Sequence, residues 1–276
     1  MLSVPMMALF GMCIGSFLNV VIHRLPLILE RDWKHDSAEL LGVKSENVHT
    51  DLTLSKPASR CPHCGHVIAW HENIPVLSYL RLGGKCSSCK APISARYPAI
   101  EIMTAALFGA VAWKFGDQPV TALWCFFVAV LVALAGIDWD TTLLPDNLTL
   151  PLLWAGLLAS ALGWTIPLSA SVWGAIAGYL SLWSVYWLFK LATGKEGMGY
   201  GDFKLLAALG AWLGVSMVLP VILASSIIGA LVGIVMKLNA SLREGRYVPF
   251  GPFLAGAGLA VLFIGAPRVM GWLGWA

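Results

Sequence analysis

The sequence predicts an all-α polytopic membrane protein with about eight transmembrane helices and a small polar domain between the first and second helices. Composition supports this class, since 58% of the 276 residues are hydrophobic and only 12% are charged. That charged share is about half the value of an ordinary soluble domain. The mean hydropathy is +0.76. The thirteen tryptophans suit anchors at the two bilayer interfaces.

Eight apolar runs approach the length of about 20 residues that a helix needs to cross a bilayer. We expect these helices at 4–22, 97–115, 119–137, 147–165, 171–190, 203–219, 220–237 and 252–274. The sixth and seventh should be joined by a very tight turn near Pro220. The first run lacks a basic leader and a cleavage site, so we interpret it as a membrane helix and not as a signal peptide.

The segment 23–96 differs from the rest of the chain. It carries all six histidines, ten of the eighteen lysines and arginines, and four of the six cysteines. The sequence therefore predicts a first transmembrane helix at 1–22, a polar domain at 23–96 and a membrane domain at 97–276. Within the polar domain, the mixed charges of 27–57 are typical of a solvated connector.

The distribution of basic residues predicts the orientation, because lysine and arginine gather in cytoplasmic loops. With eight spans, sixteen of the eighteen basic residues fall on one side, and only Lys114 and Arg268 lie opposite. We therefore expect a cytoplasmic polar domain and two periplasmic termini. The net charge of +3, without a basic stripe interleaved with aromatic residues, gives no support for nucleic-acid binding.

Four cysteines of the polar domain have the spacing C-x2-C-x21-C-x2-C. Two such pairs can close a tetrahedral thiolate shell around Zn²⁺. Disulfides or unconnected thiols are the alternatives, but a reducing cytoplasm disfavours disulfides. A shell of four thiolates leaves no open position, so the metal would be structural. We expect Gly65, Gly83 and Gly84 to form tight turns beside it, and His63 and His66 not to be ligands. The four expected ligands are Cys61, Cys64, Cys86 and Cys89.

Acidic residues gather beside two of the apolar runs, at the expected cytoplasmic side. Asp138, Asp140 and Asp146 follow the third run, and Asp202 in Gly199-Tyr200-Gly201-Asp202 precedes the sixth. Carboxylates at membrane helices are costly and usually functional, although a single one can be an interfacial acid that reaches water. Two carboxylates that share one proton can hydrolyse a peptide bond. The glycines should permit positive φ and a close approach to a substrate.

Longer motifs extend over nearly the whole chain, and together they carry a resemblance. They are Gly15–Pro26, the two C-x-x-C pairs, Arg96–Glu101, Ile137–Asp140, Leu143–Asp146, Gly199–Asp202 and Pro249–Pro252. The chain resembles the bifunctional type IV prepilin peptidases, which are G-x-G-D aspartyl proteases and N-methyltransferases of the bacterial inner membrane.

The resemblance implies a substrate, a cofactor and a pair of catalytic residues. The substrate would be a prepilin or a type II secretion pseudopilin, cleaved after a glycine and then methylated from S-adenosylmethionine. Its partners would be the pilus or type II secretion machinery and membrane lipid. Family catalytic aspartates match Asp138 and Asp202. Chemistry alone does not separate Asp138 from Asp140 or Asp146, and Asp146 after Pro145 could be a helix N-cap.

The sequence indicates the methyltransferase site less clearly. No Rossmann-type glycine motif follows a predicted strand, so the cofactor site is not of that common kind. The resemblance places methylation-sensitive positions at Gly84, Lys85 and Glu101. Lys85 could instead be a solvated loop charge, and Glu101 an interfacial acid paired with Arg96. A peptidase without methylation remains an alternative function. A carboxylate-coupled transporter ranks last, because it predicts acids near the midplane and paired repeats. The sequence does not decide between pilins and pseudopilins, or the oligomeric state.

Overall fold

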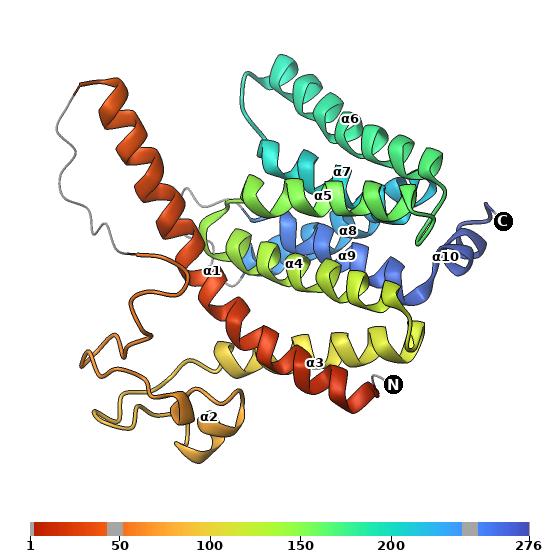
Figure 1. Cartoon of the computed structure of the whole chain (residues 1–276). Coiled ribbons are helices and arrows are strands. Elements are labelled where there is room, and N and C mark those ends of the chain that lie inside the picture. Colours follow the sequence, from red (N-terminus) through yellow and green to blue (C-terminus); the bar gives the residue numbers. More distant parts are fainter. Residues whose placement is uncertain (1–2, 43–51, 239–247, 276) are drawn as a thin grey trace. The chain divides into compact units, whose positions relative to one another are not determined.

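The computed structural model describes residues 3–42, 52–238 and 248–275, and within these ranges it contains helices and no β-strand. The chain forms two compact units, residues 1–117 and 118–276. Among the described residues, five helices are long and apolar enough to cross a membrane, or six if α9 and α10, bent by 101°, form one broken span. The predicted all-α membrane class is confirmed, and helices occupy each of the eight expected ranges (Figure 1).

In the first unit, α1 (Val4–Leu40) packs along α3 (Arg96–Phe115). Gly11 and Gly15, four residues apart, lie at the contact. A Cβ on Gly15 would lie 2.7 Å from Cα of Glu101, and one on Gly11 would lie 2.7 Å from Cβ of Phe108. Small residues at this spacing let two membrane helices approach closely. The Asn19 side-chain amide also donates to the carbonyl oxygen of Tyr97 at 3.1 Å.

The helix α1 is longer than the sequence suggested. It continues through Pro26 to Leu40, so the expected connector is wrong for residues 27–40, while residues 43–51 lie outside the described residues. An ion pair between Lys34 and Glu30, one turn apart at 2.7 Å, supports the added turns. At 1.5 Å per residue, 37 residues extend about 55 Å, against a hydrocarbon core of about 30 Å. The C-terminal turns of α1 therefore extend beyond the membrane.

The polar domain lies between α1 and α3 in the chain, as expected. Its regular elements are a short 3₁₀ helix, η1 (Trp70–Glu72), and a five-residue helix, α2 (Leu77–Arg81). Two isolated bridges, Arg60 with Val67 and Lys85 with Pro92, close its two cysteine loops.

The second unit consists of seven helices in the residues that the structure describes. They are α4 (Pro119–Thr141), α5 (Asp146–Ala161), α6 (Leu168–Thr193), α7 (Tyr200–Leu213), α8 (Val215–Leu238), α9 (Gly251–Ile264) and α10 (Ala266–Trp272). The tight turn expected near Pro220 is at Gly214, whose φ of +90° suits glycine, and Pro220 lies inside α8. With 16 and 14 residues, α5 and α7 are shorter than a full span of about 20 residues.

The short helix α7 forms the core of this unit. Gly174 of α6 and Gly210 of α7 touch so closely that a Cβ on either would collide with the backbone of the other. The Trp212 indole is fully buried and donates to the carbonyl oxygen of Leu152 in α5 at 2.8 Å. In Figure 1 the C-terminal end of α4 and the N-terminal ends of α5, α7 and α9 lie at one end of the unit. This end carries the acidic residues.

Candidate aspartyl and four-cysteine sites

Asp138 lies in the last turn of α4 and is buried, with 4% of its surface exposed. Its carboxylate Oδ2 accepts a hydrogen bond of 2.8 Å from the backbone N–H of Gly251. Gly251 is the first residue of α9, where N–H groups have no partner inside the helix. Pro252 follows and has no N–H group. The N-terminus of α9 therefore holds a carboxylate on α4 in a fixed position.

Asp202 lies in the first turn of α7 and is 7% exposed. Among the described residues, its Oδ1 is buried and accepts no hydrogen bond. A buried carboxylate oxygen without a partner is costly, and such groups concentrate at functional sites. The N-terminus of α7 stabilises a negative charge in its first turn.

The structure brings Asp138 and Asp202 together although they are distant in sequence. Their carboxyl groups are close enough for the charge of Asp138 to act on Asp202. Leu144 lies between the N-terminal turns of α7 and α9. A Cβ on Gly201 would lie 2.6 Å from Cβ of Leu144, and a Cβ on Gly251 would lie 3.1 Å from its Cδ2. Glycine at both positions thus allows α7 and α9 to close around Leu144 and beside the two acids.

The other two acids have different environments. Asp140, two residues after Asp138, is only partly buried. Asp146 is the first residue of α5 and not its N-cap, so the suggested capping role is wrong. Its carboxylate accepts two hydrogen bonds of 2.7 Å from the Lys204 ammonium group of α7. Burial thus distinguishes Asp138 from its acidic neighbours.

The glycines before Asp202 do not use the positive φ that glycine permits. Gly199 is the N-cap of α7 with φ −82°, and Gly201 is helical. Gly201 is needed because Leu144 leaves no room for a Cβ.

A polar network missed by the sequence analysis fixes the loop before this motif. Glu196 accepts hydrogen bonds from the Lys190 ammonium group at 2.8 Å and from the Tyr186 hydroxyl at 3.2 Å. The hydrogen bond and charge of Lys190 hold the pKa of Glu196 below its usual value. The rings of Tyr186 and Phe203 also lie 5.7 Å apart. The signal in the sequence was a lysine at the end of α6 followed six positions later by a glutamate.

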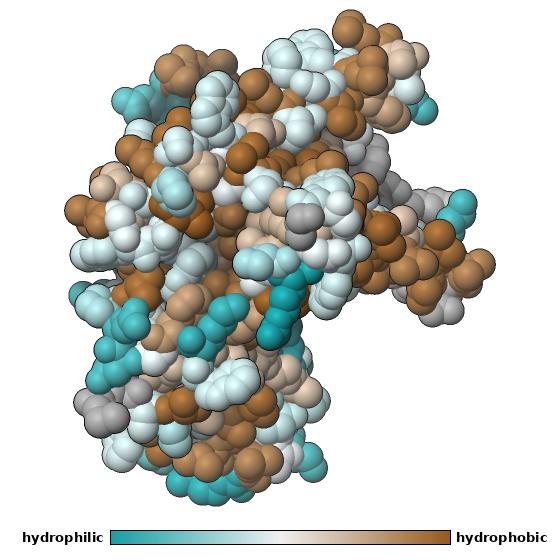
Figure 2. All heavy atoms as spheres, turned by 90° about the vertical axis from the view of Figure 1, so that its right-hand side faces the viewer, coloured by the Kyte–Doolittle hydropathy of each residue, from teal (hydrophilic) through white to brown (hydrophobic). Residues whose placement is uncertain are grey.

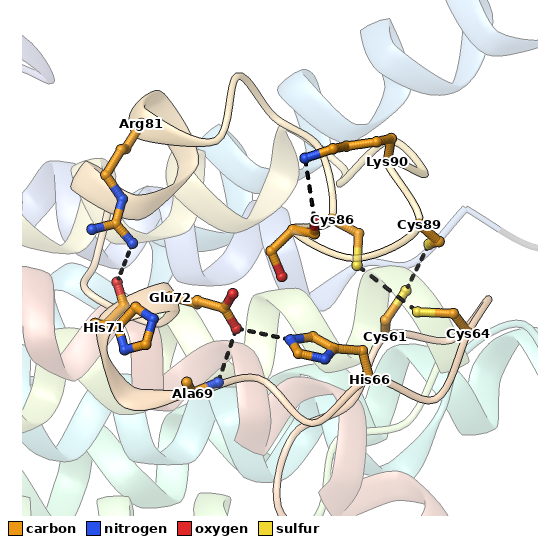
Figure 3. A network of polar contacts seen from close by, with 11 residues as sticks. Cys61, Cys64, His66, Ala69, His71, Glu72, Arg81, Cys86, Cys89 and Lys90 are labelled. Carbon is orange, nitrogen blue, oxygen red and sulfur yellow. Dashed lines mark hydrogen bonds and ion pairs between the residues drawn. The ribbon is translucent and has the colours of Figure 1, made fainter.

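The four predicted cysteines converge in the polar domain (Figure 3). All four Sγ atoms lie within 4.8 Å of one another, and the Cys61–Cys89 and Cys64–Cys86 pairs are 3.7 and 4.0 Å apart. A regular tetrahedron with Zn–S bonds of about 2.3 Å requires about 3.8 Å between sulfur atoms. All four are free thiols, so the disulfide alternative is excluded here. The donor set and its spacing fit a tetrahedral metal ion.

The two cysteine loops repeat one backbone pattern. Cys61 N–H donates to His66 and its carbonyl accepts from Gly65, while Cys86 N–H donates to Ala91 and its carbonyl accepts from Lys90. Gly65 has φ +71°, and Lys90, at the equivalent place, has φ +60°. Gly83 and Gly84 also have positive φ, so the predicted glycine turns are confirmed.

Backbone hydrogen bonds lower the pKa of the Cys61 and Cys86 thiols, whereas the neighbouring thiols raise the pKa of Cys89. Backbone N–H groups of Cys64 and His63 lower the pKa of the Cys61 thiol to about 7. His66 is not part of the cluster, since its Nε2 lies 3.1 Å from Glu72 (Figure 3). Hydrogen bonds from Ser87, from the Ala69 N–H and from His66 lower the pKa of Glu72 to about 2. Glu72 therefore connects the first cysteine loop to the second.

The residues expected near methyl transfer lie in the same unit. Gly84 has φ +68°, and a Cβ there would lie 2.9 Å from the Tyr79 hydroxyl. Lys85 is exposed. Glu101 is buried, 7% exposed, and accepts a hydrogen bond of 2.8 Å from the Val76 N–H. Glu101 thus attaches the polar domain to α3.

Comparisons with known proteins agree over most of the chain. Residues 9–115 match the bacterial peptidase A24 N-terminal domain, and residues 125–234 match the type IV leader peptidase family. The prepilin leader peptidase/N-methyltransferase of Pseudomonas aeruginosa is 52% identical over 257 residues, 93% of this chain and 89% of that protein. The protein of the same name from Aeromonas hydrophila is 54% identical over 258 residues, again 93% and 89%. No solved structure gives a significant match.

Proposed function

Because the chain belongs to the type IV leader peptidase family, we propose that it removes the leader peptide of a prepilin and then N-methylates the new N-terminus. It is a multi-pass protein of the bacterial inner membrane. The observation that carries the peptidase assignment is the pair of buried carboxylates, Asp138 and Asp202, on two helices of one unit.

In the proposed reaction the two carboxyl groups share one proton. The ionised carboxylate takes a proton from water, and the protonated partner donates a hydrogen bond to the carbonyl oxygen of the scissile peptide. The Gly251 N–H holds one oxygen of Asp138, while Oδ1 of Asp202 has no hydrogen-bond partner among the described residues and can bind water or substrate. The water oxygen bonds to the carbonyl carbon, the C–N bond then breaks, and the partner acid gives its proton to the leaving amine.

The four-cysteine cluster supports the second half of the proposal. Cys61, Cys64, Cys86 and Cys89 would hold a structural Zn²⁺, because four thiolates leave no position for substrate. S-adenosylmethionine would supply the methyl group. Gly84, Lys85 and Glu101 are our candidates for this activity, of which Gly84 and Glu101 shape the domain and Lys85 offers an exposed positive charge.

The distribution of lysine and arginine supports a cytoplasmic polar domain and periplasmic termini. The basic leader of a substrate would then meet the acids from the cytoplasmic side. Asp140 and Asp146 would lie beside it as additional negative charges. The chain would serve type IV pilus or type II secretion assembly.

The test uses the full chain in proteoliposomes with a synthetic prepilin and labelled S-adenosylmethionine, and it measures cleavage and methyl incorporation separately. Asp138→Asn and Asp202→Asn should each abolish cleavage, because each removes a proton-transfer group while keeping its shape. Both should still methylate a pilin supplied without its leader. Asp140→Asn is the matched control and should keep clear cleavage activity. Cleavage by Asp202→Asn at a rate near wild type would show that the aspartyl mechanism is wrong.

A further inference from the structure

The polar domain exposes large hydrophobic side chains on η1 and on α2. Trp70 is 80% exposed, Leu77 63% and Leu80 68%. Leu77 and Leu80 are three positions apart on α2 and therefore share a face. The Arg81 guanidinium donates to the carbonyl oxygen of His71 at 3.1 Å, which ties α2 to η1. We name Trp70, Leu77 and Leu80 together the apolar face.

A buried hydrogen bond fixes the depth of α2 along the membrane helix α3. The Val76 N–H, directly before α2, donates to the Glu101 carboxylate. Glu101 is the sixth residue of α3, about 7.5 Å from its start at 1.5 Å per residue. The helix α3 is a candidate membrane span of 20 residues, close to the thickness of the hydrocarbon core. The helix α2 therefore begins beside the second turn of a span, at the level of the membrane interface.

The charges beside the apolar face suit an anionic lipid surface. Arg81 ends α2, and the exposed Lys85 follows four residues later. The acid of this region, Glu72, is bound by His66 and by the Ala69 N–H. Figure 2 shows hydrophobic atoms over much of one face of the molecule, as expected for a chain that lies in lipid. Tryptophan with basic side chains is typical of membrane-interface anchors.

We propose that the apolar face of Trp70, Leu77 and Leu80 inserts into the interface of an anionic bilayer beside α3. The polar domain is then held against the membrane at three points: the helices α1 and α3 to which it is joined, the bond between Val76 and Glu101, and the apolar face. Insertion is favourable because it removes the apolar surface of these side chains from water. This anchor is independent of the two proposed activities.

The test places a photoreactive diazirine amino acid at position 80 of the full chain. The protein is reconstituted in nanodiscs of phosphatidylethanolamine and phosphatidylglycerol together with a prepilin, irradiated and analysed by mass spectrometry. The matched control is the same probe at Leu40, which is 88% exposed at the end of α1, beyond the membrane. We expect several-fold more lipid adducts at position 80 than at position 40.

A second variant tests the insertion itself. Leu77→Glu places a charge in the interface and should reduce the lipid adducts formed by the probe at position 80, because a charged group resists transfer from water. Unchanged zinc content would show that the domain is still folded. Equal lipid adducts at positions 40 and 80 would overturn the proposal. Adducts at position 80 with prepilin in place of lipid would also overturn it, because the face would then bind protein.

Discussion

The substitution Gly251→Ala tests whether the N-terminus of α9 positions Asp138. A Cβ on Gly251 would lie 2.7 Å from Oδ2 of Asp138 and 3.1 Å from its Cγ, both closer than an ordinary contact. Leu144 blocks movement in another direction, since its Cδ2 would be 3.1 Å from the new atom. The carboxylate must therefore move away, and its hydrogen bond of 2.8 Å to the Gly251 N–H is stretched or lost.

The expected effect follows from the strength of that bond. A hydrogen bond to a charged group contributes about 1.5–3 kcal/mol. If the displaced carboxylate loses this amount in the transition state, each 1.4 kcal/mol reduces kcat/KM about tenfold. We therefore expect leader cleavage to fall by about tenfold to 150-fold. Methylation of a pilin without its leader should be unchanged, because the polar domain contains none of these atoms.

The assay compares kcat/KM for prepilin cleavage by the full chain in proteoliposomes. Gly256→Ala is the matched control, since it makes the same change on the same helix and a Cβ there meets nothing within 4 Å. Thermal unfolding of both variants separates a local effect from misfolding. If the two variants are equally stable and their kcat/KM values for cleavage differ by less than twofold, the N-terminus of α9 does not position Asp138.

Two further predictions concern the metal and the loop before α7. Cys64→Ser should lower the zinc content below one ion per chain and impair methylation but spare cleavage, because three thiolates leave the shell incomplete; freshly purified wild-type protein with four titratable thiols and no zinc would contradict this. Glu196→Gln should speed amide hydrogen exchange of residues 194–199 at pH 7, because it weakens the bond to Lys190. The folded pKa of Glu196 is lowered, so its contribution is fully present above the unfolded value of about 4.3 and is lost as the pH falls from there through the lower folded pKa. Variant and wild type should therefore converge once the pH is below the folded pKa and Glu196 is protonated, and a difference that persists there would show that the charge is not responsible.

The sequence alone determined the membrane class and the cysteine cluster, because both depend on local patterns. Hydropathy over about 20 residues decides whether a helix suits lipid, and each pair of cysteines is built within one short loop. The repeated bonds around Cys61 and Cys86 confirm that these loops fold similarly. The clustering of acids on one side also followed from the order of the apolar runs.

The ends of the helices could be predicted less well from the sequence. The first helix was expected to end at residue 22 and a turn was expected near Pro220, yet Pro26 and Pro220 both lie inside helices. The break occurs at Gly214, where the chain needs a positive φ. Tertiary packing can stabilise a helix that contains a proline. Helix propensity, which is a local property, does not include this stabilisation.

The family resemblance selected Asp138, but only the tertiary structure gave a physical difference between Asp138, Asp140 and Asp146. The three carboxylates are chemically equivalent in the sequence, and they differ in burial and in partner: the Gly251 N–H for Asp138 and Lys204 for Asp146. Gly251 is 113 positions from Asp138, and Lys204 is 58 positions from Asp146. Such contacts form only when helices distant in the chain pack side by side, so no local pattern of residues determines them.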